Sequence, residues 1–232
     1  MNDLTGKHVI ITGASKGLGK SVASYLYSQG ASLTLLSRHL PELEKEFGGL
    51  DQKRILLLET DITEEKNIEV AVKQSIAKFS TIDVLINNAG VFTDKPIDKI
   101  SGVDFDRLMN TNVKGMFLMS KTIVPLMKKQ HKGYIVNVGS KISHNTNVSA
   151  NKTLYAVSKY SVEGFSLALN NELKPFGIRV TCIMPGTLKT FFSFKSSKYL
   201  KPEKVAQILH FMISQEDVDF ESIVFKSIKQ QI

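Results

Sequence analysis

The stretch TGASKGLG, residues 12–19, ends an apolar run and opens an amphipathic one, and it decides the fold. Its glycines allow the backbone to turn tightly and to approach a bound phosphate closely. The helix that follows offers free N–H groups and the positive end of its dipole. A glycine-rich turn alone also fits an ordinary strand-to-helix connection, but its place after the first predicted strand favours a dinucleotide-binding turn.

The rest of the chain repeats the order strand, then helix. Apolar runs rich in Val, Ile and Leu, with little polar alternation, are typical of strands buried on both faces. Such strands are predicted at 8–12, 32–36, 54–58, 84–87, 134–138, 179–183 and 222–225. Helices are predicted at 17–29, 40–47, 64–79, 105–130, 153–174 and 202–215. The alternation predicts a single α/β domain over 1–232, a doubly wound (Rossmann) parallel sheet of seven strands with helices on both faces.

Composition narrows the class of protein. The 232 residues suffice for one domain with a large core, and the single cysteine, Cys182, excludes an intrachain disulfide. Neither a signal-peptide pattern nor a run of about 18 apolar residues is present, so we expect a cytoplasmic protein without a membrane partner. The net charge of +8 comes from scattered lysines, which favours a solvated basic surface over nucleic-acid binding.

The second predicted strand is followed by Ser37 and Arg38, where an NAD-selective site usually carries an acidic residue. Arg38, together with Lys16 in the glycine loop, suits the 2′-phosphate of NADP. Two ordinary surface cations are the alternative. We predict NADP(H) in preference to NAD(H), and no metal.

Further motifs lie at the ends of the later predicted strands, namely DIT at 61–63, NNAG at 87–90, Ser140 and Pro185-Gly186. Two more lie within predicted helices, namely TNV at 111–113 and YAVSK at 155–159. In this order, and with the glycine loop, they make the sequence resemble the short-chain dehydrogenases/reductases over nearly the whole chain. The resemblance implies an NADPH-dependent oxidoreductase that transfers a hydride between the nicotinamide and a carbonyl or secondary alcohol. It implies four catalytic residues, namely Asn112, Ser140, Tyr155 and Lys159. The predicted cofactor-binding residues are Gly13, Ser15, Lys16, Gly17, Leu18, Gly19, Ser37, Arg38, Asp61, Ile62, Asn88, Ala89, Gly90, Tyr155, Lys159, Pro185, Gly186 and Thr190.

The resemblance also implies individual roles. Asp61 would hold the adenine amino group, and Pro185-Gly186, with Thr190 behind it, would meet the nicotinamide carboxamide. Asn112 would anchor a water that relays protons through Lys159, which would also bind the nicotinamide ribose.

The chemistry of Tyr155 and Lys159 follows from their spacing. A phenol titrates near pH 10 unaided, and residues four apart share one helix face. We expect the Lys159 ammonium to stabilise phenolate and lower the pKa of Tyr155, so that it acts as acid in reduction and base in oxidation. Ser140 would hydrogen-bond the substrate oxygen. Taken alone, the Tyr and Lys also fit a surface helix pair.

One feature departs from the family. Ser140 and Tyr155 are fifteen positions apart, more than is usual, whereas Ser143 is twelve away. We prefer Ser140 because it comes at the end of the fifth predicted strand, after Asn137-Val138-Gly139, which makes 141–152 an enlarged loop. His144, Asn145 and Asn147 in this loop either contact substrate or are solvated.

The segment 188–201 is predicted to select the substrate. Four aromatic residues in it either cover an apolar substrate as a lid or simply pack a short connector: Phe191, Phe192, Phe194 and Tyr199. The resemblance implies a homodimer or homotetramer formed through helices 105–130 and 153–174. An apolar set there either forms that interface or belongs to the core: Met109, Met116, Phe117, Met119 and Met127. The alternative function is a non-catalytic dinucleotide sensor on the same fold.

Overall fold

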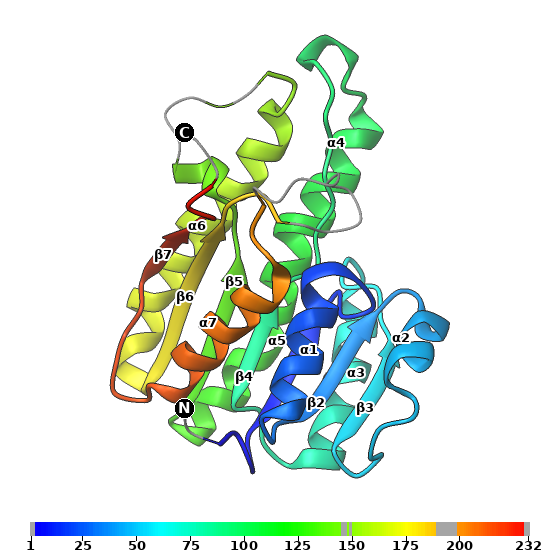
Figure 1. The fold of residues 1–232 in the computed structure, drawn as a ribbon, viewed down its shortest axis with the longest axis vertical. Coiled ribbons are helices and arrows are strands. Elements are labelled where there is room, and N and C mark those ends of the chain that lie inside the picture. The colour runs from blue at the N-terminus through cyan, green and yellow to red at the C-terminus, as the bar shows by residue number, and fades with distance from the viewer. Residues whose placement is uncertain (1–2, 145–147, 149, 189–198, 230–232) are drawn as a thin grey trace.

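The computed structural model describes residues 3–144, 148, 150–188 and 199–229. Within these residues one seven-stranded sheet runs through the molecule, in the order β3-β2-β1-β4-β5-β6-β7, with every neighbouring pair parallel (Figure 1). The strands are β1 His8–Thr12, β2 Ser32–Ser37, β3 Ile55–Glu59, β4 Val84–Asn87, β5 Gly133–Val138, β6 Ile178–Pro185 and β7 Ser222–Phe225. The prediction of a doubly wound sheet is confirmed.

Helices cover both faces of the sheet. The longer ones are α1 Gly17–Ser28, α2 Leu40–Phe47, α3 Glu65–Phe79, α4 Gly102–Met109, α5 Gly115–Gln130, α6 Thr153–Leu173 and α7 Pro202–Ser214. Short 3₁₀ turns are η1 Ile97–Lys99, η3 Lys141–His144 and η4 Lys174–Phe176, and η2 Asn110–Lys114 is a π-helical segment. One hydrophobic cluster joins α1, α2 and α7 to the sheet, and a second joins α3, α5 and α6 to the opposite face (Figure 1).

Strand β1 is apolar without alternation because both of its faces are buried. Val9 and Ile11 enter the cluster beneath α1 and α7, while Ile10 enters the cluster beneath α3 and α5. All three side chains are fully buried. A parallel strand in the middle of the sheet therefore needs apolar residues at every position, which is the pattern the sequence shows.

The order of the strands places a crevice at the end of β1. Ile11 pairs with Leu35 of β2 on one side and with Ile86 of β4 on the other. The chain therefore winds outward in opposite directions from β1 and β4. At such a switch point the loops after the two strands diverge, and ligands bind between them.

The predicted helix 105–130 is not continuous. It consists of α4 and α5, joined by the π-helical turn η2. The face predicted as interface or core is mostly core, since Met116, Met119 and Met127 are buried. Phe117, by contrast, is 46% exposed. No helix in the described part of the chain has the length and apolar character needed to cross a bilayer.

Candidate active site

The glycine loop between β1 and α1 leaves no room for side chains. Gly13 has a φ of +65°, and a Cβ there would lie 2.8 Å from the Cα of Ala89. A Cβ on Gly19 would overlap the carbonyl oxygen of Gly13. Gly17 also adopts a positive φ, of +57°. The loop therefore folds closely against the segment after β4, as a phosphate cradle requires.

Asn88 binds the glycine loop to the end of β4. Its side-chain Nδ2 donates to the carbonyl oxygens of Thr12 at 2.9 Å and Gly13 at 3.1 Å. The Thr12 hydroxyl in turn accepts hydrogen bonds from the backbone N–H groups of Asn88 and Ala89, both at 3.0 Å. Sequence reasoning missed Thr12, whose only signal is a hydroxyl residue directly before the first glycine. These bonds hold the two sides of the crevice in register.

The N-terminus of α1 is free to receive an anion. Its N-cap residue, Lys16, makes no side-chain capping bond, so the first N–H groups have no side-chain acceptor from the N-cap residue. Ser15 and Leu18 are buried beneath the loop. The residues present fit a dinucleotide, because the close-packed glycines and the uncapped helix end meet in one crevice.

Two exposed cations lie in the loops after β1 and β2. Lys16 and Arg38 are both exposed, and within the described residues neither forms an ion pair. Ser37 is buried at the end of β2, where its Oγ accepts from the N–H of His39 at 3.1 Å. The turn that this bond closes contains Arg38, which stands at the carboxyl edge of the sheet.

The loop after β3 is fixed by Asp61 and Ile62. The carboxylate Oδ1 of Asp61 accepts from the N–H of Thr63 at 2.9 Å and from its hydroxyl at 2.8 Å. Ile62 is buried against Gly115, where an added Cβ would lie 2.6 Å from the Ile62 Cδ1. The first residue of α5 therefore has to be small for this loop to reach the crevice.

Asn112 occupies the π-helical turn η2. Its Nδ2 donates to the Val91 carbonyl at 3.0 Å and to the Ser158 hydroxyl at 3.1 Å, and its Oδ1 accepts from the Val91 N–H at 2.8 Å. Asn112 is 2% exposed. Single π turns inside α-helices often occur at functional sites. Here the turn presents one buried amide to both the segment after β4 and helix α6, and Ser158 is a partner that the sequence did not reveal.

Lys159 is buried, and a hydrogen bond fixes the direction of its side chain. Its Nζ donates to the carbonyl oxygen of Val138 at 2.8 Å, at the end of β5. A Cβ on Gly90 would lie 3.8 Å from this Nζ and 3.3 Å from the Oδ1 of Asn112, so Gly90 leaves the space between them open. Burial lowers the pKa of Lys159 from 10.5 to about 8, against the opposing influence of Cys182.

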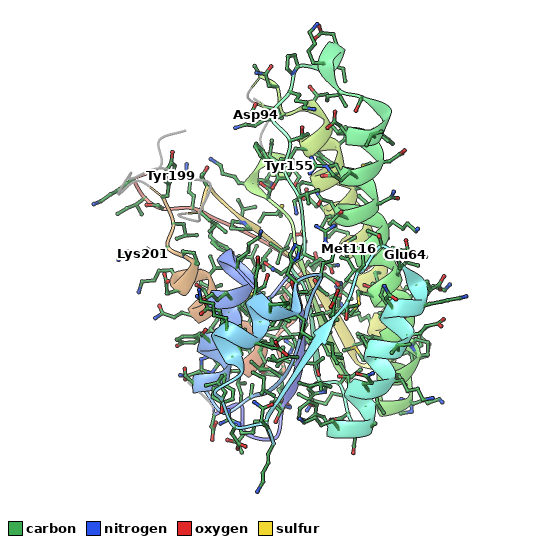
Figure 2. The ribbon with its side chains drawn as sticks, turned by 90° about the vertical axis from the view of Figure 1, so that its right-hand side faces the viewer. Glu64, Asp94, Met116, Tyr155, Tyr199 and Lys201 are labelled. Carbon is green, nitrogen blue, oxygen red and sulfur yellow. The ribbon has the colours of Figure 1, made fainter. Side chains whose placement is uncertain are left out.

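Tyr155 lies four residues before Lys159 and faces the same space. Figure 2 shows it at the end of the molecule that also carries Asp94 and Tyr199. The Lys159 Nζ is 5.8 Å from the centre of the Tyr155 ring. Phe92 meets the ring edge-on, with the centroids 4.9 Å apart. Sequence reasoning missed this contact, since a single Phe after the NNAG motif carries no signal of its own.

The expected direction of the Tyr155 pKa was wrong for this structure. Burial raises the pKa of Tyr155 above 10.0, and a hydrogen bond with Ser140 opposes the rise. The physical reason is that burial disfavours the phenolate, while the Lys159 ammonium is bonded to Val138 rather than to the phenol oxygen. Tyr155 is therefore held in its protonated form at neutral pH.

The hydrogen bonds in and beside η3 distinguish Ser140 from Ser143. Ser143 is 5% exposed, and its Oγ donates to the Ser140 carbonyl at 3.0 Å and to the Met184 Sδ at 3.3 Å. Ser143 therefore binds within the protein, whereas the Ser140 Oγ accepts from the Ile142 N–H at 3.3 Å and its hydroxyl lowers the pKa of Tyr155. His144 in the same turn is exposed, and Asn145 and Asn147 lie outside the described residues.

The segment after β6 begins at the site. Pro185 ends the strand, and the N–H of Gly186 donates to the Phe225 carbonyl at 2.7 Å. Leu188 forms a parallel bridge with Leu200, so the two ends of the predicted substrate segment lie side by side. The predicted residues Thr190, Phe191, Phe192 and Phe194 lie outside the described residues. The described part of the chain holds no group of His, Cys, Asp and Glu suited to a metal.

Comparisons with known proteins find similar sequences and structures among the short-chain dehydrogenases. The family model of the short chain dehydrogenases matches residues 7–200. A 3-oxoacyl-[acyl-carrier-protein] reductase from Thermotoga maritima is 33% identical over 230 residues, 92% of each chain. A 3-ketoacyl-(acyl-carrier-protein) reductase from Brucella melitensis, solved with NADH, superposes with a TM-score of 0.90 at 27% identity, covering 98% of this chain and 99% of its own. The closed form of a serine dehydrogenase with NADP+ gives 0.90 at 26% identity, covering 97% and 96%.

The family match spans most of the chain, and the similar structures share the parallel sheet described above. With the glycine crevice, the asparagine on the π turn and the Tyr-Lys pair on α6, this chain belongs to the short-chain dehydrogenase family of oxidoreductases.

Proposed function

We propose that the protein is an NADPH-dependent reductase that converts a carbonyl group into a secondary alcohol, with Tyr155 as the proton donor. The observation that carries the proposal is the buried ammonium of Lys159 at 5.8 Å from the centre of the Tyr155 ring, with Ser140 acting on the same phenol. These three groups lie at the carboxyl ends of the strands, beside the crevice that fits a dinucleotide.

The residues of the chain have separable roles in this proposal. When bound, the reduced nicotinamide supplies the hydride that carbonyl reduction requires. Ser140 donates a hydrogen bond to the substrate oxygen and stabilises its developing negative charge. Tyr155 then gives its proton to that oxygen, which completes the alcohol. A phenol whose pKa is raised by burial is protonated at neutral pH, which suits a donor and hence the direction of reduction.

Lys159 and Asn112 restore the proton on Tyr155. A buried lysine with a pKa of about 8 exchanges its proton readily near neutral pH. Its Nζ faces the open space beside Gly90 and the Asn112 amide, where a water can connect it to solvent. Lys159 would also bind the nicotinamide ribose, and Pro185 and Gly186 the carboxamide, as the family pattern implies.

NADP(H) is the proposed cofactor on the basis of Lys16 and Arg38. Both are exposed at the crevice, and no described acidic side chain pairs with them. Asp61 would hold the adenine amino group through the side of its carboxylate that Thr63 leaves free. The similar solved structures are described with NADH in one case and with NADP+ in another, so the choice rests on this chain's own cations.

Two further points belong to the proposal. A homodimer or homotetramer is supported by exposed apolar side chains along α5 and α6, namely Phe117, Val157, Tyr160 and Leu167. A reducing, cytoplasmic setting is supported by Cys182, a buried free thiol.

The rival proposal is a dinucleotide sensor without catalysis. The test measures NADPH oxidation against aldehydes, ketones and keto acids, with Tyr155→Phe as the matched variant. We expect turnover that falls about 100-fold or more in the variant, while NADPH binding measured by fluorescence is unchanged. NADPH binding without turnover of any carbonyl would establish the sensor instead.

A further inference from the structure

Two lysines meet at the substrate side of the proposed site. Lys141 directly follows Ser140 at the start of η3, and Lys226 directly follows Phe225, the last residue of β7. Both are half-buried, η3 contacts β7, and the charge of Lys226 acts on Lys141. Two neighbouring like charges repel each other, and an anion that bound to both would relieve the repulsion.

The end of β6 brings the two lysines together. Pro185 of β6 pairs with Phe225 of β7, and the N–H of Gly186 donates to the Phe225 carbonyl at 2.7 Å. On the other side of β6, the N–H of Gly139 donates to the Ile183 carbonyl at 2.8 Å. The residues that follow β5 and β7, among them Lys141 and Lys226, therefore leave the sheet on either side of the end of β6 (Figure 1).

Among the ion pairs formed by the described residues, none includes Lys141 or Lys226. Burial lowers the pKa of Lys141, and the neighbouring charge of Lys226 lowers it further. The sequence after β5, β6 and β7 has the same bias, because the segments 141–152, 188–201 and 226–232 contain lysines but neither aspartate nor glutamate.

The dinucleotide does not explain this charge. Its phosphates would lie at the glycine loop after β1, whereas the lysine pair stands beyond β5, β6 and β7, on the far side of Ser140. The pair therefore faces the part of the site where the substrate, rather than the cofactor, would extend.

We propose that the substrate carries an anionic group, a carboxylate or a phosphate, and that Lys141 and Lys226 bind it together. This inference rests on the proposed reductase activity, since it names the class of carbonyl substrate for that same site. The pair orients the substrate so that its carbonyl oxygen meets Ser140 and Tyr155. Ammonium groups bind either anion as point charges, so the size of the acid and its distance from the carbonyl select among substrates.

The test compares charged carbonyl compounds with neutral partners of the same skeleton. The probes are pyruvate, acetoacetate and levulinate with their methyl esters, and dihydroxyacetone phosphate with dihydroxyacetone. The wild type should reduce at least one charged probe more efficiently than its neutral partner. Lys141→Met and Lys226→Met should each lower kcat/KM for that probe by about ten- to hundredfold, mainly through KM. Both should leave the neutral partner and the KM for NADPH within about twofold, since neither lysine would contact them.

Two variants serve as controls. Lys141→Arg keeps the charge and should restore much of the preference, which a merely structural role of the lysine would not predict. Lys73→Met, on the exposed face of α3, removes the same charge far from the site and should leave the preference intact. Equal efficiency on charged and neutral probes, unchanged by either Met variant, would overturn the inference and leave the reductase proposal standing.

A second readout does not depend on turnover. Lysines are acetylated under limiting reagent in the presence of NADPH, and the modified peptides are quantified by mass spectrometry. The preferred anionic probe should protect Lys141 and Lys226 several-fold, its neutral partner should not, and Lys73 should be indifferent to both. Protection without reduction of any probe would support anion binding while refuting the reductase. Equal labelling with and without every charged probe would refute the lysine-pair site.

Discussion

The ammonium of Lys159 lies 5.8 Å from the centre of the Tyr155 ring and donates its hydrogen bond to the Val138 carbonyl instead of the phenol. The lysine is therefore not a hydrogen-bond partner of the phenol. Ser140 is the residue whose hydroxyl lowers the pKa of the phenol, against the effect of burial. This division of roles separates the effects that substitutions at the three positions should have.

Replacing Lys159 should reveal the cost of burying its charge. The pKa of Lys159 is about 8 in the folded protein and near 10.5 in the unfolded chain. Between pH 8 and pH 10.5, therefore, the unfolded chain binds more protons than the folded protein. The free energy of unfolding of the wild type, minus that of Lys159→Met, should therefore rise with pH across this window, by up to about 3 kcal/mol. Denaturant unfolding at several pH values measures the difference. A difference that is flat, or that falls with pH, would contradict it.

Ser140 and Ser143 should differ sharply in kinetics. Ser140→Ala removes the hydroxyl that would stabilise the developing charge on the substrate oxygen, and we expect kcat to fall roughly 100-fold. Ser143→Ala removes bonds to the Ser140 carbonyl and the Met184 sulfur, and we expect a loss of about 1 kcal/mol in stability with kcat within a few-fold. Steady-state kinetics and thermal unfolding of both variants check this, and a larger kcat loss in the Ser143 variant would reverse the assignment.

Arg38 should govern the choice between the two nicotinamide cofactors. Arg38→Asp places an acid where a free ribose hydroxyl would be bound and repels a 2′-phosphate. We expect kcat/KM for NADPH to fall about ten- to hundredfold and that for NADH to rise. Lys73→Asp, with the same change of charge on α3, is the control and should leave the NADPH-to-NADH ratio unaltered. An unchanged ratio in Arg38→Asp would show that the cation is an ordinary surface residue.

Gly19 should tolerate no side chain. In Gly19→Ala the new Cβ would overlap the Gly13 carbonyl and lie 2.5 Å from the Asn88 Nδ2. Opening this contact would break the bonds between Asn88 and the glycine loop, at a cost of at least about 2 kcal/mol in stability, with loss of NADPH binding.

The control for Gly19 is Gly164, within α6, where an added Cβ meets nothing within 4 Å. Gly164→Ala should raise the free energy of unfolding by about 0.5–1 kcal/mol, because alanine loses less entropy in a helix. Calorimetry and NADPH titration compare the two. Normal cofactor binding by Gly19→Ala would show that the crevice is looser than the contacts indicate.

Much of this protein was determined by its sequence alone. Unbroken apolar runs need burial on both faces, and their alternation with amphipathic stretches leaves few arrangements other than a parallel sheet between helix layers. Each predicted strand and helix therefore overlaps an observed one. The motifs at the strand ends identified the family for the same reason, since the carboxyl ends of parallel strands gather at one edge.

Only the tertiary structure decided how the side chains meet at that edge. The π turn that presents Asn112, the Thr12 hydroxyl that bonds to the NNAG segment and the edge-on contact of Phe92 with Tyr155 join residues distant in sequence. Helical spacing predicted that Lys159 would lower the pKa of Tyr155, but the pKa depends on burial and on the direction of each donor, which packing sets. The meeting of Lys141 and Lys226 likewise depends on the pairing of β6 with β7, because neighbours across a sheet carry no mark of each other in their local sequence.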